Sequence, residues 1–79
     1  MHPRVLSAKY EGNYKLWLQF TNNEIKRFDF ETYLHFPVYE PLKDEAFCRK
    51  LKVSDGIVQW NDHIDFDPAT VYLESKKIS

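Results

Sequence analysis

Apolar and polar residues alternate along the first part of the chain, which is the pattern of β-strands with one buried face. Three such runs follow one another, at residues 4–11, 14–20 and 24–30. Gly12-Asn13 separates the first two runs, and the asparagine-rich segment 21–23 separates the last two; both are typical of tight turns. The pattern therefore predicts three consecutive antiparallel strands joined by hairpins.

The register of the second hairpin follows from its apolar residues. A two-residue loop would set charged residues opposite both leucines of the second run. A three-residue loop instead sets Phe28 opposite Leu18 and continues with Phe30 opposite the other leucine, Leu16. Because a slip of one residue moves every side chain to the other face, we predict the three-residue loop or one of the same parity. Even-numbered residues of this hairpin then face the core.

The Asp55-Gly56 pair marks a hairpin in the second half of the chain. Asp-Gly favours a type I′ turn, and apolar residues alternate on both sides of it. This turn pairs Val53 with Val58 and gives the hairpin one apolar face. Residues 31–42, which contain two prolines, are expected to be irregular.

Two aspartates predict the starts of helices. Asp44 caps a short helix over residues 45–50. Asp67 caps a second helix, which begins with a proline and ends near the lysines at 76–77, where positive charge is favourable. Asp65, just before this helix, is interpreted as a turn-stabilising residue.

Length and composition agree with one small domain. A chain of 79 residues has a thin core, and its six Phe, five Tyr and two Trp supply much of the apolar surface that folding can bury. The expected fold class is α+β: a small single domain over residues 1–79, built from antiparallel β-hairpins with one or two short helices. The roughly five short strands expected cover residues 4–11, 14–20, 24–30, 51–54 and 57–60.

The charge balance and the single cysteine narrow the class of protein. Eleven basic residues against 12 acidic ones give a net charge of −1, which argues against a dedicated nucleic-acid binder. One cysteine excludes an internal disulfide and suits a reducing compartment. No apolar run near the start is long enough for a signal peptide or a membrane span. We therefore expect a cytoplasmic protein without a membrane partner.

Residues that could carry chemistry are scattered along the chain. Cys48 lies on the apolar side of the first predicted helix, where a free cysteine acts as a small hydrophobe. His2, His35 and His63 show none of the spacings of a metal site. The acidic cluster at residues 62–67 lacks the glycine and the terminal glutamate of a calcium loop. We therefore expect no catalytic residue, no metal site and no cofactor, and we do not expect an enzyme.

One face of the first sheet is left without a structural role. Trp17, Gln19, Ile25 and Arg27 share the face opposite the core, and we take them as the candidate interaction surface. Trp and Arg are typical anchors of protein interfaces, but a basic and aromatic sheet face can also stack the bases of single-stranded nucleic acid. The final helix could instead cover this face. An unpaired sheet edge, open to a second copy or to a partner strand, is a further candidate contact.

A series of apolar and turn residues runs through the chain at fixed spacing. It comprises Pro3-x-Val5, Leu16-x-Leu18-x-Phe20-x-Asn22-Asn23-Glu24, Phe28-Asp29-Phe30, Tyr33-Leu34, Leu42-x-Asp44, Phe47, Val53-x-Asp55-Gly56-x-Val58-x-Trp60, Ile64-Asp65-Phe66-x-Pro68 and Val71-Tyr72. In this order and spacing the chain resembles a bacterial family, the domain of unknown function 2442, over nearly its whole length.

The resemblance implies a small α+β fold and no established enzymatic activity. Members of the family are often encoded beside small toxin-like proteins, including a family called domain of unknown function 4160. That makes this protein similar to an antitoxin or a partner-binding module. The chain departs from the family at two turns, where Asn23 replaces a usual glycine and residues 61–63 replace a usual Pro and Gly. No catalytic or ligand-binding residues carry over.

The leading hypothesis is a non-catalytic protein-interaction module, the antitoxin-like partner of a neighbouring toxin-like protein or a self-associating protein. The alternative is a module that binds single-stranded nucleic acid through the face of Trp17 and Arg27.

Overall fold

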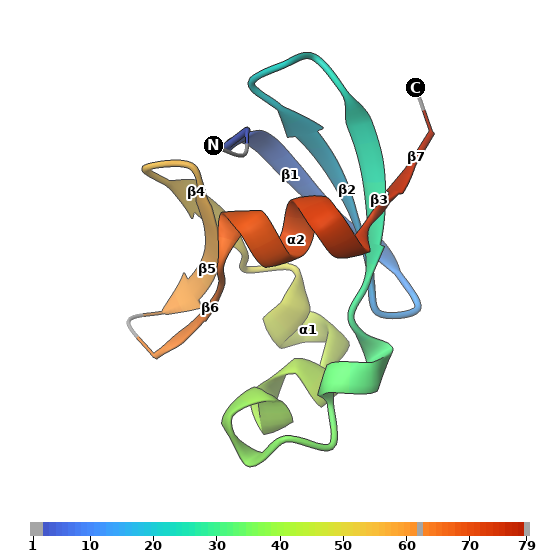
Figure 1. Cartoon of the computed structure of the whole chain (residues 1–79). Coiled ribbons are helices and arrows are strands. Elements are labelled where there is room, and N and C mark those ends of the chain that lie inside the picture. Colours follow the sequence, from blue (N-terminus) through green and yellow to red (C-terminus); the bar gives the residue numbers. More distant parts are fainter. Residues whose placement is uncertain (1–2, 62, 79) are drawn as a thin grey trace.

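Two antiparallel sheets form the framework of the protein in a computed structural model that describes residues 3–61 and 63–78 (Figure 1). The larger sheet has the strand order β1-β2-β3-β7, and the smaller has the order β4-β5-β6. The strands are β1 (Val5–Gly12), β2 (Lys15–Phe20), β3 (Ile25–Asp29), β4 (Lys52–Ser54), β5 (Ile57–Asn61), β6 (Ile64–Phe66) and β7 (Lys76–Lys77).

Four short helical segments connect and cover the strands. They are the 3-10 helices η1 (Glu31–Tyr33) and η2 (Pro37–Lys43) and the α-helices α1 (Glu45–Cys48) and α2 (Pro68–Glu74). The carboxylate of Asp44 accepts a hydrogen bond from the amide of Ala46 at 3.0 Å, and that of Asp67 accepts one from the amide of Thr70 at 3.2 Å. Both predicted helix caps are therefore confirmed.

The hairpin turns use residues that tolerate a positive φ. Asp55 (φ 53°) and Gly56 (φ 79°) form the turn between β4 and β5, and Val53 lies opposite Val58, as predicted. The turn between β1 and β2 consists of two residues with positive φ, Asn13 and Tyr14, one position later than predicted.

The β2–β3 hairpin has the predicted parity but not the predicted pairs. Leu16 lies opposite Phe28, and Leu18 lies opposite Lys26. The loop comprises residues 21–23 and so has three residues, as predicted, whereas the predicted pairs require a loop at residues 22–24. Each pair is therefore shifted by two residues, and the even-numbered side chains still face the core.

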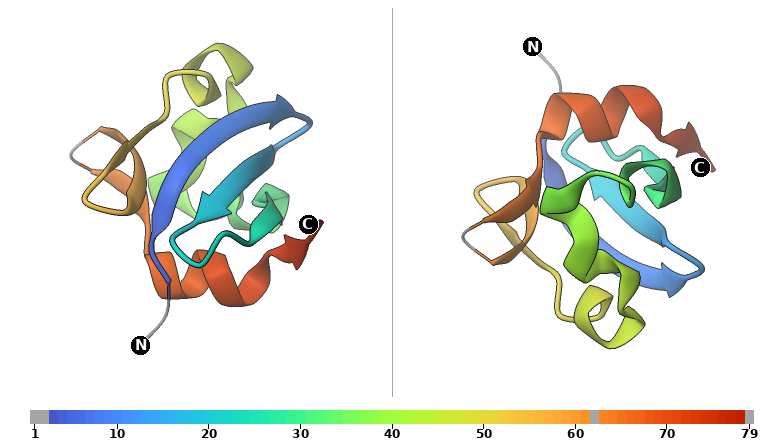
Figure 2. Two further views of the ribbon diagram at one scale, coloured as in Figure 1. Left: turned by 90° about the horizontal axis from the view of Figure 1, so that it is seen from above. Right: turned by 90° about the horizontal axis from the view of Figure 1, so that it is seen from below.

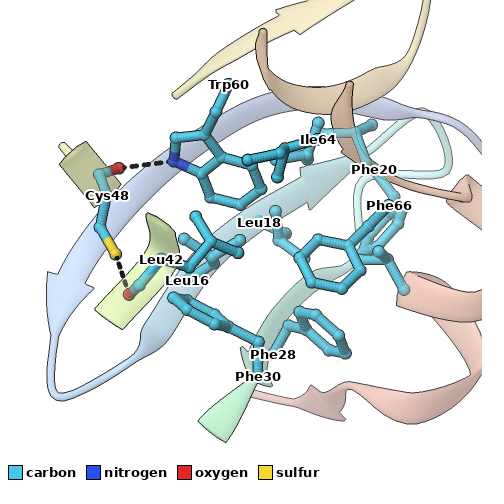
Figure 3. Close-up of a cluster of buried hydrophobic side chains, with 13 residues drawn as sticks. Leu16, Leu18, Phe20, Phe28, Phe30, Leu42, Cys48, Trp60, Ile64 and Phe66 are labelled. Carbon is cyan, nitrogen blue, oxygen red and sulfur yellow. Dashed lines mark hydrogen bonds between the residues drawn. The ribbon is translucent and has the colours of Figure 1, made fainter. Parts of the chain in front are cut away.

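The core lies between the two sheets. Phe66 of the smaller sheet contacts the rings of Phe28 and Trp60, with centroid distances of 5.2 and 5.8 Å. Such tilted or edge-on ring pairs add to the free energy gained from burial. The buried apolar residues are Val5, Leu16, Leu18, Phe20, Phe28, Phe30, Leu42, Cys48, Val58, Trp60, Ile64, Phe66 and Val71 (Figure 3).

Two hydrogen bonds tie α1 to the core beside these rings. The indole Nε1 of Trp60 donates to the carbonyl of Cys48 at 2.9 Å, and the Sγ of Cys48 donates to the carbonyl of Leu42 at 3.0 Å (Figure 3). Burial also raises the pKa of the Cys48 thiol, which keeps it protonated. Cys48 is thus a small buried residue that closes the packing around Trp60.

The helical segments and the smaller sheet lie on one side of the larger sheet. In the left view of Figure 2, β1 and β2 pass in front of the green helical segments, and in the right view these segments lie in front of the strands, while α2 runs along one side of the sheet in both views. On that side α2 contacts the sheet through Tyr72, whose ring packs edge-on against Phe20 at 5.1 Å. The ammonium of Lys26 donates to the carbonyl of Tyr72 at 2.6 Å. The core face of the sheet is therefore the covered one.

The described residues form one α+β domain, as predicted, but with seven strands instead of about five. The acidic segment before α2 is a strand, β6, because Ile64 and Phe66 are buried while Asp65 between them is exposed and lies opposite Gln59. Our interpretation of Asp65 as a turn residue is therefore wrong. The second helix ends at Glu74, near the two lysines as predicted, but these lysines form β7 and do not belong to the last turn of the helix.

Candidate functional site

The four residues of the candidate interaction surface lie together on the outer face of the larger sheet. Trp17 on β2 is opposite Arg27 on β3, and Gln19 is opposite Ile25 one pair along the same ladder. Their neighbours Leu16 and Leu18 are fully buried, so strand alternation directs these four side chains away from the core. Since α2 packs on the core face, it does not cover this surface.

Trp17 is partly exposed between two cations from the neighbouring strands. Lys9 on β1 lies opposite it on one side, and its Nζ is 5.3 Å from the centroid of the indole ring. Arg27 lies opposite it on the other side. A cation over an indole face is attracted by the ring quadrupole, so Lys9 restrains the orientation of Trp17.

Arg27 is held in place by Glu11 of β1. Its Nε and Nη2 donate to Oε1 and Oε2 of Glu11 at 2.7 and 3.2 Å, a two-point ion pair that spans the sheet from β3 to β1. These hydrogen bonds lower the pKa of Glu11 and raise that of Arg27. Since both side chains are partly open to solvent, the pair adds little to stability. Its main effect is to fix the guanidinium beside Trp17.

A hollow of about 340 Å³ adjoins this surface. It lies where β7 and the end of α2 meet β2 and β3, and sequence reasoning missed it because it did not predict β7. In β7, Lys76 lies opposite Arg27 and thus joins the outer face. The lining residues are Lys15, Arg27, Asp29, Glu74, Lys76, Lys77 and Ile78.

Both edges of the larger sheet carry features that oppose strand pairing with another molecule. The ladder of β1 is irregular at Leu6 and at Glu11, and bulges of this kind twist an edge away from a flat partner. β7 at the other edge is two residues long, and both residues are exposed lysines. Natural proteins use short and lysine-bearing edges to prevent edge pairing. The outer face is therefore a better contact surface than either edge.

The residues considered for catalysis or metal binding are separate in the structure. Cys48 is buried, His35 stacks on Phe36 with a centroid distance of 4.2 Å, and His63 lies exposed in the turn before β6. His2 and Asp62 are outside the described residues. Within residues 3–61 and 63–78, no three His, Cys, Asp or Glu side chains are grouped as metal ligands. No helix of the described chain is long and apolar enough to cross a membrane.

Comparisons with known proteins identify the family. No curated protein and no solved structure gives a significant match to the chain. A family described as "Protein of unknown function (DUF2442)" matches residues 5–77. This match runs from the first residue of β1 to the last residue of β7, and so includes both sheets and the outer face. The chain therefore belongs to the DUF2442 family of proteins of unknown function.

Proposed function

We propose that this protein is a non-catalytic protein-interaction module that binds its partner through the outer face of the larger sheet. One observation carries the proposal: the helices and the smaller sheet all lie on the core side, which leaves Trp17 and Arg27 on the uncovered face. Trp and Arg are the residues that most often dominate the binding energy of protein interfaces. Their restraint by Lys9 and Glu11 lowers the entropy lost on binding.

The partner we propose is a small toxin-like protein encoded beside this one, so that the module acts as its antitoxin-like partner in the cytoplasm. The support is the resemblance between this chain and proteins that are commonly encoded in that arrangement. A second copy of the chain is the other occupant considered, and the guarded strand edges favour face-to-face rather than edge-to-edge association.

A non-catalytic role is supported by the separation of the reactive side chains. Catalysis by a cysteine nucleophile requires a thiolate within hydrogen-bond reach of a base. The thiol of Cys48 is buried, and its hydrogen bond goes to the carbonyl of Leu42.

Binding of single-stranded nucleic acid is the second candidate function. It is favoured by the cations that share the outer face with Trp17, namely Lys9, Lys15, Arg27 and Lys76. The net charge of −1 and the pairing of Arg27 with Glu11 weigh against it. Such binding would weaken steeply with salt, so the absence of any RNA or DNA shift at low salt would eliminate this function.

Co-expression with the product of the adjacent gene tests the proposal. The wild-type chain is expected to copurify with that product, and Trp17→Ala or Arg27→Ala is expected to reduce the yield of complex strongly. Leu73→Ala is the matched control, because Leu73 is 64% exposed on α2. Circular dichroism establishes that each variant is folded. An unchanged complex with folded Trp17→Ala and Arg27→Ala variants would show that the interface lies elsewhere.

A further inference from the structure

We infer that the hollow beside Trp17 receives an acidic side chain of the protein partner, bound by Lys76 and the remaining donors of Arg27. This inference rests on the proposed function, because it names the chemistry of the partner at the same face. The hollow is formed by residues of four separate elements, β2, β3, α2 and β7.

Lys76 is the cation at the hollow whose side chain has no partner among the described residues. Its side chain has no ion pair or hydrogen bond with any residue in the described part of the chain. It lies opposite Arg27, whose bonds to Glu11 use Nε and one hydrogen of Nη2. A guanidinium has five N–H donors, so Arg27 keeps donors for a second acceptor. Together the two residues offer a carboxylate a charged, multiply hydrogen-bonded position.

The carboxylates in and near the hollow are already occupied. Oδ1 of Asp29 accepts from the amide of Glu31 at 3.0 Å, and its Oδ2 lies 3.9 Å from the ammonium of Lys15. Glu74 accepts a hydrogen bond from the hydroxyl of Tyr33. The carboxylate of Glu11 is held by Arg27, as described above. Four basic residues and two acidic ones line the hollow, so the net charge of its lining is positive.

Lys77 does not share this role. Its ammonium lies 3.9 Å from Oε1 of Glu24, and its position in β7 is opposite Lys26, whose side chain is on the core side. The site thus depends on Lys76 and Arg27 rather than on all the lysines that line the hollow.

The form of the hollow favours a protein segment over a nucleic acid. Asp29 and Glu74 line it together with the cations, so a phosphate backbone crossing it would meet repulsion. A single carboxylate on an otherwise uncharged segment brings one negative charge to Lys76 and meets less of that repulsion than a run of phosphates. Ile78 at the same hollow is 45% exposed and offers an apolar contact. The expected occupant is therefore a Glu or Asp next to an apolar residue.

A peptide titration followed by NMR tests this assignment directly. The probe is an acetylated and amidated Gln-Leu-Glu-Leu peptide, added to the ¹⁵N-labelled protein, with Gln-Leu-Gln-Leu as the uncharged control. The acidic peptide is expected to shift the amide signals of Arg27, Lys76 and Ile78, and the control peptide is expected to leave them in place. Lys76→Glu replaces an attraction by a repulsion and should weaken the binding by about fivefold or more, whereas Lys52→Glu should change it by less than about twofold, since an exposed charge pair alone contributes up to about fivefold. Lys52 is an exposed lysine of β4, in the other sheet.

The possible results separate the two proposals. Equal shifts from both peptides, no shift at the hollow, or stronger shifts of the same signals by an oligothymidylate would overturn the inference. If the peptide fails while Trp17→Ala still breaks the complex with the adjacent gene product, the proposed function stands and only the acidic chemistry is wrong. If the peptide binds at Lys76 but no complex depends on Trp17, the proposed function is wrong.

Discussion

Trp17 on β2 lies directly opposite Arg27 on β3, and Arg27 in turn holds Glu11 on β1 through hydrogen bonds of 2.7 and 3.2 Å. The indole therefore lies on a sheet whose three hairpin-connected strands are joined by side chains as well as by the backbone. A platform of this kind presents an aromatic anchor with little freedom left to lose on binding. This relationship is the basis of the proposed interface.

The two tryptophans are expected to respond differently to the same substitution. Trp60→Phe removes the donor for the buried carbonyl of Cys48 and should lower the free energy of unfolding by about 1–3 kcal/mol. Trp17→Phe, on the outer face, should change it by less than about 0.5 kcal/mol. Urea unfolding followed by circular dichroism measures both values. Similar losses for the two variants would contradict the assignment of Trp60 to the core and Trp17 to the surface.

The two glycines, both with positive φ, form a second matched pair. A Cβ on Gly56 would lie 2.7 Å from the Cβ of Arg4, whereas a Cβ on Gly12 would meet nothing within 4 Å. Gly12→Ala should therefore lower the free energy of unfolding only by the conformational cost of a positive φ, about 1–2 kcal/mol. Gly56→Ala should lower the free energy of unfolding by at least about 1 kcal/mol more than Gly12→Ala, because the new contact with Arg4 forces the backbone to shift. Thermal unfolding of the two variants tests this order, and the reverse order would disprove the close contact.

Stability should fall at acid pH through two carboxylates. A hydrogen bond from Tyr72 lowers the pKa of Glu24 below its ordinary value of 4.5, and one from Arg27 does the same for Glu11. The unfolded state then binds protons first as the pH falls, so the stabilisation is complete above pH 4.5 and is lost as the pH falls through the folded-state pKa values.

Urea midpoints measured at several pH values follow this loss. The midpoint of the wild-type protein should stay level from about pH 7 to about pH 5 and fall below it. Glu24→Gln should show a shallower fall, since one of the two titrating groups is gone. A variant curve parallel to that of the wild type would mean that Glu24 does not contribute.

The hairpins could be predicted from the sequence because their signals are local. The alternation along β2 and β3 placed Trp17 and Arg27 on the outer face, and the Asp55-Gly56 pair specified its own turn. The exact β2–β3 pairs could not be predicted, because moving the loop by one residue preserves the parity that the apolar residues require.

The two missed strands depend on distant partners. β7 has two lysines and no apolar pattern, and it becomes a strand only because α2 returns the chain to β3. β6 has just three residues, so its alternation of apolar and polar residues is a weak signal for a strand. The aspartates around it favour a turn instead. The hollow includes residues of β7, so the role of Lys76 could not be inferred before the tertiary structure was known.

The affinity of the complex between this protein and the adjacent gene product, measured by titration calorimetry, tests the central proposal most directly. A residue that anchors an interface costs at least about 2 kcal/mol when truncated, so Trp17→Ala should weaken binding about 30-fold, and Leu73→Ala should leave it within about twofold of wild type. Wild-type affinity for a folded Trp17→Ala variant, or an equal loss for Leu73→Ala, would contradict the assignment of the outer face as the binding surface.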